Sequence, residues 1–295
     1  MRSEKRIYAL GFFDGVHLGH QALLSACRDL ADKEGCTPAA ITFAAHPKSL
    51  FSASVPALLT TCQDRQALMH RYGISHIHCF PTTKEVMSTS WQDFLEQLLE
   101  EGAAGFVCGH DFRFGHRGEG NSEKLCAFCA GKCLPCVIIP EQSFGGKRVS
   151  STLIRGLIED GEMESATKFL GHPHVLTGTV RPGQQLGRKL GVPTANLLIP
   201  EGIVVPKFGV YTCRAVVDGV SHLAVANVGV RPTVSGSGIT VEPWILDFSG
   251  DLYGREIRLE FYRFLRPEMK FETLADLQQQ ILQDAAETRR YFETK

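Results

Sequence analysis

Short apolar runs alternate with amphipathic segments along the first half of the chain. Five runs rich in apolar or β-branched residues predict strands, at residues 7–12, 39–43, 76–80, 105–108 and 136–139. Between the first two, apolar side chains recur at helical spacing on one face, at Leu23, Leu24, Cys27, Leu30 and Ala31. Strands that alternate with helices over this length predict an α/β fold, with a parallel sheet covered on both faces.

The pattern changes near residue 170. From there on, short strand-like runs are separated by glycine and proline, at residues 175–180, 194–198, 210–217, 223–228, 240–248 and 257–264. Such spacing predicts an antiparallel sandwich or barrel. A closing helix is expected after Thr273, which has the side chain of an N-cap and precedes an apolar stripe. We therefore predict two domains, residues 1–170 and 171–295.

Composition and charge exclude several classes of protein. The chain has 295 residues, 43% of them hydrophobic, and a formal net charge of −1. It therefore has no bulk attraction for a nucleic-acid backbone or an anionic membrane, and neither partner is expected. No apolar stretch approaches the roughly 18 to 20 residues that span a bilayer. The apolar run near the N-terminus is too short for a signal peptide, so we expect a cytoplasmic protein.

The clearest chemical signal follows the first predicted strand, in the sequence GFFDGVHLGH at residues 11–20. His17 and His20 are three residues apart, so their rings should lie on one side of an opening helical turn. Gly15 and Gly19 allow a ligand to approach the backbone, and a helix N-terminus attracts anions. Two histidines without a role are the alternative. The order of strand, glycines, histidines and helix favours a phosphate site, although GxGxxG and Walker A motifs are both missing.

Two further segments of the first half carry candidate ligand-binding residues. The sequence SSTLIR at residues 150–155 predicts a helix start at which hydroxyl groups and Arg155 can hold a polyphosphate. The sequence GHDFRFG at residues 109–115 places two phenylalanines where they can wall a flat ligand, or simply be buried in a loop.

These motifs, together with the His46-Pro47 pair, resemble the nucleotidyltransferase module of the bacterial bifunctional riboflavin kinase/FAD synthetases. The resemblance implies a Rossmann-like α/β domain in which the FMN phosphate attacks the α-phosphorus of ATP, giving FAD and pyrophosphate. It implies that His17 and His20 stabilise the transition state. The implied ATP-binding residues are Gly11, Phe12, Asp14, Gly15, Gly19, Ser151, Thr152 and Arg155, and the implied flavin-binding residues are His46, Asp111 and Phe112.

In the second half, the sequence GRKLGVPTAN at residues 187–196 joins a glycine-punctuated loop to a predicted strand. Thr194 and Asn196 are two apart, so both side chains should face the same way and offer hard oxygen ligands to Mg²⁺. Taken alone, such a triplet is usually structural. Glu242 lies in an apolar strand, where it is either an edge residue facing water or a general base beside a substrate hydroxyl.

The sequences GRKLGVPTAN, NVGVRPT and DLYG, in this order around Glu242, resemble the riboflavin kinase module of the same family. The resemblance implies a six-stranded antiparallel barrel closed by the C-terminal helix. It implies that Thr194 and Asn196 bind Mg²⁺ with ATP as co-substrate, and that Glu242 activates the ribityl 5′-hydroxyl of riboflavin. Further ATP contacts are implied for Gly187, Gly191 and Asn227.

The two resemblances together predict an enzyme that converts riboflavin to FMN and then FMN to FAD. An enzyme with one active site, or a flavin-responsive regulatory protein without turnover, is the alternative. Both sets of motifs are intact, which favours the two-site enzyme. The sequence leaves self-association and protein partners open.

The resemblance does not explain four cysteines, Cys126, Cys129, Cys133 and Cys136. Such a run can bind zinc or an iron–sulfur cluster, but its spacing differs from that of the usual ribbons and clusters. The first three also recur at i, i+3 and i+7, the spacing of a buried helical stripe. We therefore expect a structural role for them.

Overall fold

The computed structural model describes residues 4–52, 54–182, 187, 191–233 and 236–294. The chain forms two compact units. The first unit comprises Met1–Leu58 and Cys62–Ser151, and the second comprises Leu59–Thr61 and Thr152–Lys295. This division follows contacts within the chain, and the domain boundary expected at residue 170 stays a prediction.

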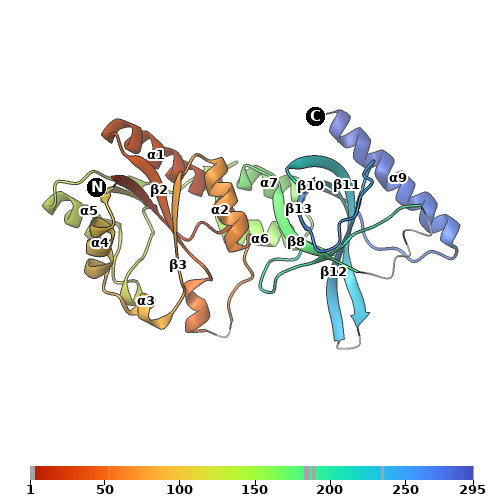
Figure 1. Cartoon of the computed structure of the whole chain (residues 1–295), viewed down its shortest axis with the longest axis horizontal. Helices are drawn as coiled ribbons and strands as arrows, with labels where there is room; N and C mark the ends of the chain where they lie inside the picture. The colour runs from red at the N-terminus through yellow and green to blue at the C-terminus, as the bar shows by residue number, and fades with distance from the viewer. Residues whose placement is uncertain (1–3, 53, 183–186, 188–190, 234–235, 295) are drawn as a thin grey trace. The chain divides into compact units, whose positions relative to one another are not determined.

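The first unit contains a five-stranded sheet in the order β3-β2-β1-β4-β5 (Figure 1). The strands are β1 Arg6–Leu10, β2 Thr37–Phe43, β3 His76–Phe80, β4 Ala103–Gly109 and β5 Cys136–Ile139. Every pairing between them is parallel, which confirms the predicted class of sheet.

Helices cover both faces of this sheet. Successive residues of β1 point to opposite sides, so β1 contributes side chains to two separate cores. Ile7 and Ala9 pack in one core with α1 (Leu18–Glu34) and α2 (Cys62–Arg71). Tyr8 and Leu10 pack in the other core with α4 (Trp91–Glu100) and α5 (Ser122–Gly131). The other elements are α3 Lys84–Ser88, η1 Asp14–Val16, η2 Pro47–Leu50, η3 His116–Gly118 and the hairpin of β6 Ser143–Phe144 and β7 Lys147–Arg148.

The second unit begins with two helices and continues as a closed antiparallel barrel in the order β10-β11-β12-β9-β8-β13 (Figure 1). This confirms the predicted six-stranded barrel. Its elements are α6 Ser151–Glu159, α7 Met163–Leu170, β8 His174–Arg181, β9 Asn196–Leu198, β10 Gly209–Val217, β11 Val220–Thr233, β12 Gly236–Ile245, β13 Glu256–Arg266 and α9 Leu274–Glu293.

The C-terminal helix α9 packs against the barrel as predicted. Thr273 is its N-cap, and the Thr273 side chain accepts a hydrogen bond from the backbone N–H of Asp276. On the barrel side, the hydroxyl groups of Thr212 and Thr288 lie 3.0 Å apart in a fully buried contact between β10 and α9.

The strand predicted at residues 194–198 is shorter in the structure. Strand β9 begins only at Asn196, and Thr194 before it forms an isolated antiparallel bridge with Trp244 of the neighbouring strand β12. The strands predicted at residues 223–228 and 240–248 are parts of a longer ribbon, in which Val220–Thr233 pairs with Gly236–Ile245.

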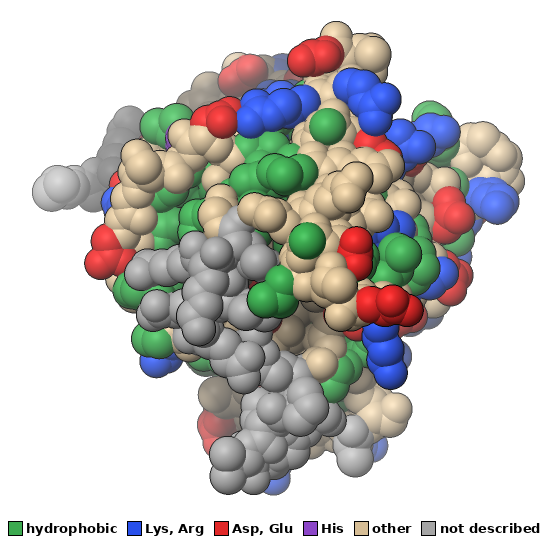
Figure 2. Space-filling model, turned by 90° about the vertical axis from the view of Figure 1, so that its right-hand side faces the viewer, with side chains coloured by type: hydrophobic (Ala, Val, Ile, Leu, Met, Phe, Trp, Pro, Cys, Tyr) green, Lys and Arg blue, Asp and Glu red, His purple; other side chains and the backbone are tan. Residues whose placement is uncertain are grey.

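The surface agrees with a net charge near zero. On the face shown in Figure 2, positive and negative side chains are interspersed. Among the described helices, none has the length and hydropathy needed to cross a bilayer.

The structure changes part of the cysteine prediction. Helix α5 ends at Gly131, so Cys133 lies beyond the helix, exposed and with φ of 56°. The predicted stripe is therefore wrong for Cys133. Cys129 is buried, and the Sγ atom of Cys126 lies 3.7 Å from that of Cys136. In the described parts of the chain, no three Cys, His, Asp or Glu residues are grouped to hold a metal ion. The structural role of the cysteines stays a prediction.

Candidate active sites

The first candidate site is a cavity of about 180 Å³ at the carboxyl edge of the parallel sheet. It lies where β1 and β4, adjacent in the sheet, send their chains in different directions. Ligands of open α/β sheets bind at such switch points. The cavity is lined by His17, Gly19, His20, Leu23, Gly109, His110, Asp111, Ile139, Pro140, Glu141, Gln142, Arg148, Val149, Ser150 and Ser151.

His17 and His20 are brought together in this cavity, as the sequence predicts. Their rings are stacked, with centroids 3.6 Å apart. His17 is the N-cap of α1, and its Nδ1 accepts a hydrogen bond from the backbone N–H of His20. Burial, followed by the neighbouring His17 and Arg65, holds the pKa of His20 well below its ordinary value. His20 is therefore a neutral imidazole, and its buried Nδ1 has no hydrogen-bond partner in the described chain.

The loop between β1 and α1 has a strained backbone. Phe13 and Val16 both adopt positive φ, 60° and 41°, which bulky and β-branched residues rarely do. Gly15, at φ 79°, takes the same conformation without a Cβ penalty. Such strain persists only where the surrounding structure imposes it, and it is common at ligand sites. The loop therefore holds a fixed backbone directly before His17, which lines the cavity.

Gly11 and Asp14, which were also predicted to bind the nucleotide, belong to this loop, and Ser151 contacts it. Gly11 packs so closely on the Phe13 ring that a Cβ there would lie 3.0 Å from ring atoms. Asp14 is buried, and its backbone oxygen accepts a hydrogen bond of 3.1 Å from the Ser151 hydroxyl. Thr152 and Arg155 follow on α6 and belong to the second unit.

An ion-pair network that the sequence did not predict lies at the mouth of the cavity. Arg148 Nη2 lies 2.6 Å from a carboxylate oxygen of Asp111, and Arg148 Nε lies 3.1 Å from Glu141. In the sequence, the one hint that Arg148 lies at this site is its position two residues before Ser150, next to the predicted helix start. Asp111 is thus neutralised by a cation of its own unit.

The predicted flavin-binding residues are divided between two cavities. Asp111 lines the cavity of the stacked histidines, whereas His46 and Phe112 line a second cavity of about 410 Å³. The second cavity is largely apolar, and Phe112 and Phe114 stack there with centroids 5.7 Å apart. Cationic side chains also line it, namely those of Lys48, Arg113 and Arg117. Phe12 meets His46 edge to face at 5.1 Å.

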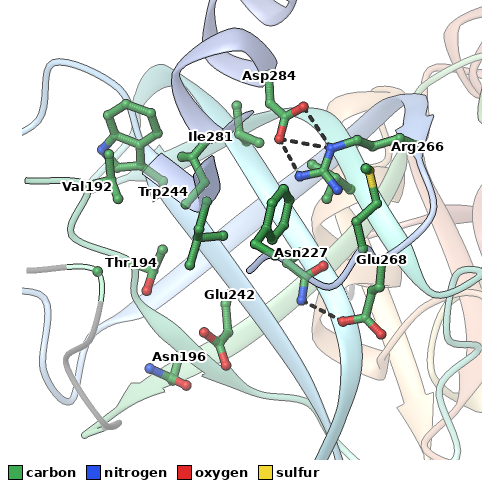
Figure 3. A pocket seen from close by; sticks show the side chains of 16 residues that line it. Val192, Thr194, Asn196, Asn227, Glu242, Trp244, Arg266, Glu268, Ile281 and Asp284 are labelled. Atoms are coloured by element: carbon green, nitrogen blue, oxygen red, sulfur yellow. Dashed lines mark hydrogen bonds and ion pairs between the residues drawn. The ribbon is translucent and has the colours of Figure 1, made fainter. Parts of the chain in front are cut away.

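The third cavity, of about 260 Å³, lies at the barrel (Figure 3). It brings together most of the residues predicted for the second half. Its polar lining consists of Thr194, Asn196, Asn227, Glu242, Arg266, Glu268 and Asp284, and its apolar lining includes Val192, Trp244, Phe271, Leu277 and Ile281. Gly187 also lines it, packed so that a Cβ would collide with the backbone oxygen of Val192. Gly191 lies in a turn before strand β9 and has a φ of 69°.

Glu242 is placed by strand pairing. It lies on β12 directly opposite Asn227 on β11, so both side chains project on the same face. Asn227 Nδ2 donates a hydrogen bond of 3.0 Å to Glu268. Glu242 is only half-buried. A carboxylate so placed lines the cavity and can reach a ligand in it.

The donor set beside Glu242 fits a hard cation. In Figure 3 the Asn196 amide lies close to the Glu242 carboxylate, and the Thr194 hydroxyl lies on the same side of the cavity. Hydroxyl, amide and carboxylate oxygens are the ligands that Mg²⁺ uses when it also binds nucleotide phosphates. Thr194 and Asn196 could therefore hold this ion.

A buried ion pair, also unpredicted, closes the opposite wall. Arg266 at the end of β13 binds Asp284 on α9 through two nitrogens, with Nη2 2.7 Å and Nε 3.0 Å from the two carboxylate oxygens. Asp284 is only 4% exposed. Since the pair joins the last strand to the closing helix, it fixes the helix that lines the cavity.

Comparison with known proteins gives the same two modules. A family model described as FAD synthetase matches residues 1–153, and one described as riboflavin kinase matches residues 170–292. The bifunctional riboflavin kinase/FMN adenylyltransferase of Listeria monocytogenes is 35% identical over 291 residues, which covers 97% of this chain and 92% of that protein. The protein of the same description from Bacillus subtilis is 32% identical, over 98% of this chain and 93% of that protein.

One solved structure matches the whole chain. It is a Streptococcus pneumoniae chain described as a macrolide-efflux protein, with a TM-score of 0.86 and 28% identity, over 98% of this chain and 95% of that chain. The match includes both units, in the same order along the chain. From the family matches and the full-length relatives together, the chain belongs to the bifunctional riboflavin kinase/FMN adenylyltransferase family.

Proposed function

We propose that the two reactions of this family run at the separate cavities described above. The barrel cavity transfers the γ-phosphoryl group of ATP to riboflavin, giving FMN and ADP. The cavity of the stacked histidines transfers the adenylyl group of a second ATP to FMN, giving FAD and pyrophosphate. The observation that carries the proposal is that His17, Gly19, His20 and Ser151 line one cavity, whereas Thr194, Asn196, Asn227 and Glu242 line another.

For the kinase reaction, Glu242 is the general base. The ribityl 5′-hydroxyl transfers its proton to the Glu242 carboxylate as its oxygen attacks the γ-phosphorus, and ADP leaves. Asn227 holds the nucleotide from the neighbouring strand, with Gly187 and Gly191 in the loop beside it. Trp244 and Phe271 line the cavity and give the flavin ring an apolar surface on which to pack.

Mg²⁺ in the barrel cavity would be held by Thr194 and Asn196. The ion supplies positive charge that neutralises the nucleotide phosphates. The carboxylate of Glu242 lies next to these donors in Figure 3, so the proton acceptor and the phosphate-binding groups meet at one point. This arrangement positions the reacting groups without a covalent enzyme intermediate.

For adenylyl transfer, His17 and His20 stabilise the charge that develops on the α-phosphoryl group as the FMN phosphate attacks it. No proton has to be removed from the FMN phosphate, so positioning and electrostatics carry the reaction. His20 is neutral, and it acts as a hydrogen-bond donor from the wall of the cavity. Ser151, Thr152 and Arg155 hold the pyrophosphate leaving group.

The flavin of the second reaction is proposed to occupy the larger apolar cavity of the first unit. Phe112 offers a face for the isoalloxazine ring, and His46 contacts Phe12 of the nucleotide loop. Asp111 lies in the neighbouring cavity, next to Arg148. A phosphate-bearing ligand there meets the cationic side chains of Lys48, Arg113 and Arg117.

The test is the time course of flavins formed from riboflavin, ATP and Mg²⁺, separated by chromatography. FMN should rise first and then decline as FAD accumulates. FMN alone would mean that only the barrel site turns over. If neither product forms, the chain is a binding protein that keeps the folds without the activities.

We also propose a cytoplasmic location with no nucleic-acid or membrane partner. The support is the near-neutral charge and the interspersed surface charges. Cell fractionation followed by immunoblotting tests it, and recovery in the membrane pellet would contradict it.

A further inference from the structure

Two thiols that neither reaction uses lie side by side in the first unit. Cys62 is the first residue of α2, and Cys79 is on β3. Their Sγ atoms are 3.1 Å apart, and Gln66 Nε2 donates to Cys62 Sγ at 3.1 Å. Both side chains are half-buried, so small molecules can reach them. A disulfide bond requires the sulfurs to approach by about one ångström more, which side-chain rotation can supply.

We propose that Cys62 and Cys79 form a reversible dithiol–disulfide site that is oxidised by hydroperoxides and that lowers FMN adenylylation when oxidised. A reducing compartment, as expected for this chain, keeps such a pair reduced until an oxidant appears. Disulfides found there are usually transient or redox-sensing.

The surroundings give the two thiols different roles. Burial raises the pKa of Cys62, but hydrogen bonds from Cys79 and Gln66 and the nearby Arg65 guanidinium outweigh it and hold that pKa below its usual value. Burial, followed by the contact with Cys62, raises the pKa of Cys79 to about 11. The thiolate is the nucleophile, so Cys62 attacks the oxidant and Cys79 resolves the product.

The chemistry balances with a hydroperoxide as the oxidant. The Cys62 thiolate attacks the peroxide oxygen, the O–O bond breaks, and Cys62 becomes a sulfenic acid as water or an alcohol leaves. The Cys79 sulfur then attacks the Cys62 sulfur, an S–S bond forms, and a second water leaves with the Cys79 proton. Two electrons pass from the two thiols to the peroxide. A dithiol reductant reverses the change through a mixed disulfide.

Arg65 connects this pair to the adenylyltransferase site. Its side chain is fully buried and lies over the Phe12 ring at 4.5 Å, while Nη2 donates to the backbone oxygen of Phe43. Phe12 belongs to the proposed nucleotide loop, and Phe43 lines the proposed flavin cavity. Arg65 thus touches a residue of each.

Oxidation changes the contacts of Arg65. Cys62 and Asp14 lie near its guanidinium, and Nε and Nη1 of Arg65 have no hydrogen-bond partner in the described chain. A disulfide bond draws the Cys62 sulfur about one ångström toward Cys79 and away from its present neighbours. We expect Arg65 to shift with this change and to displace the Phe12 ring, so that FMN and ATP are held less well for reaction.

The remaining cysteines provide internal controls. Cys126 and Cys136 lie 3.7 Å apart in the same unit, and Cys133 is exposed. Neither site contacts Phe12 or Arg65 through any interaction in the described chain. A peroxide effect on FAD synthesis that came from general thiol damage would therefore not depend on Cys62.

The test treats reduced full-length protein with hydrogen peroxide, blocks remaining thiols with N-ethylmaleimide and maps the unreduced peptides by mass spectrometry. The expected product is a peptide pair linked through Cys62 and Cys79. FAD formation from FMN should fall about fivefold or more and return with dithiothreitol, whereas FMN formation from riboflavin in the same sample should not change.

Cys62→Ser and Cys79→Ala should each keep FAD synthesis and lose its sensitivity to peroxide, whereas Cys133→Ser should stay sensitive. The proposal is overturned if both thiols are still alkylated after peroxide treatment, if the linked protein makes FAD at the reduced rate, or if Cys62→Ser stays sensitive. The effect of the disulfide on adenylylation rests on the proposed function. A reduced protein that makes no FAD would contradict the proposed function, whereas the results above would contradict the redox site.

Discussion

The imidazole rings of His17 and His20 stack face to face, with their planes only 12° from parallel. Two stacked imidazoles this close cannot both carry a proton without repulsion, and burial already disfavours the charged form of His20. In the proposed adenylyl transfer, the pair therefore offers the polyphosphate hydrogen-bond donors that are fixed by the start of α1.

Replacing His20 with alanine should stop the reaction sequence at FMN. Loss of one preorganised donor at a developing charge lowers the rate about 100- to 1,000-fold. FAD formation from supplied FMN should fall by that factor, while FMN formation at the barrel stays normal. His116→Asn, in η3 of the same unit, serves as the control and should keep both rates. Normal FAD output from His20→Ala would remove His20 from the mechanism.

Glu242→Gln should abolish FMN formation and leave FAD synthesis from supplied FMN intact. The amide keeps the shape of the side chain but cannot accept the hydroxyl proton, and a general base contributes about 100- to 10,000-fold. Both rates are measured on one preparation by chromatography of flavins. Glu201→Gln removes an exposed carboxylate of the same unit and should change neither rate. Loss of both activities in Glu242→Gln would count against separate sites.

Much of the fold was predictable because it follows from local patterns. Short apolar runs predicted the strands of the sheet and of the barrel, apolar residues at helical spacing predicted helices such as α1, and the Thr273 cap predicted the start of α9. The predicted element boundaries are wrong where the observed pairing or the observed end of a helix differs from the local pattern. The predicted strand at 194–198 shortens to β9 Asn196–Leu198, and Thr194 keeps only an isolated bridge to Trp244 of the neighbouring strand β12. Cys133 leaves its predicted stripe because α5 stops two residues earlier.

The candidate sites were predictable where their residues form a compact motif. His17 with His20, and Asn196 with Thr194, are close in sequence, so spacing alone predicts a shared face. Long-range partners have no such signal. Arg148 reaches Asp111 from 37 residues away, and Arg65 of α2 lies over the ring of Phe12, which is in the loop after β1. Their roles follow only from the three-dimensional arrangement.

Asn196→Ala should raise the Mg²⁺ concentration that half-saturates FMN formation. The variant removes one of two proposed oxygen ligands, and we expect a shift of about tenfold or more by analogy with other weakened metal sites. Asn196→Asp keeps an oxygen at the same place and should shift it far less. The measurement is a Mg²⁺ titration of the kinase rate at fixed ATP. An unchanged titration in Asn196→Ala would exclude Asn196 as a ligand.

Asp284→Ala should destabilise the barrel unit. It leaves the Arg266 guanidinium without its carboxylate in a site where Arg266 is only 16% exposed. Breaking a buried pair costs about 3 kcal/mol. The free energy of unfolding in urea measures the loss.

Asp247→Ala is the matched control for that experiment. It also breaks an ion pair to α9, since Arg289 Nη1 lies 2.8 Å from Asp247, but both partners are solvent-exposed. Exposed pairs contribute little, so unfolding should not change measurably. Equal effects of the two variants would mean that burial does not decide the strength of the Arg266–Asp284 pair.

His174 should make the stability of the barrel fall in mild acid. Burial, and then the neighbouring His172, lower the pKa of His174 to about 3, against about 6.5 in an unfolded chain. Below pH 6.5 the unfolded chain therefore binds a proton that the folded barrel excludes, so stability is lost as pH falls and is constant above that value.

The expected loss for His174 is about 2 kcal/mol between pH 6.5 and pH 5, at about 1.4 kcal/mol for each pH unit. Urea unfolding can be followed through Trp244, since Trp91→Phe removes the other of the chain's two tryptophans. In that background His174→Gln should flatten the pH dependence by this amount, and His222→Gln should leave it in place. The same slope with and without His174 would show that this buried imidazole is protonated in the folded barrel.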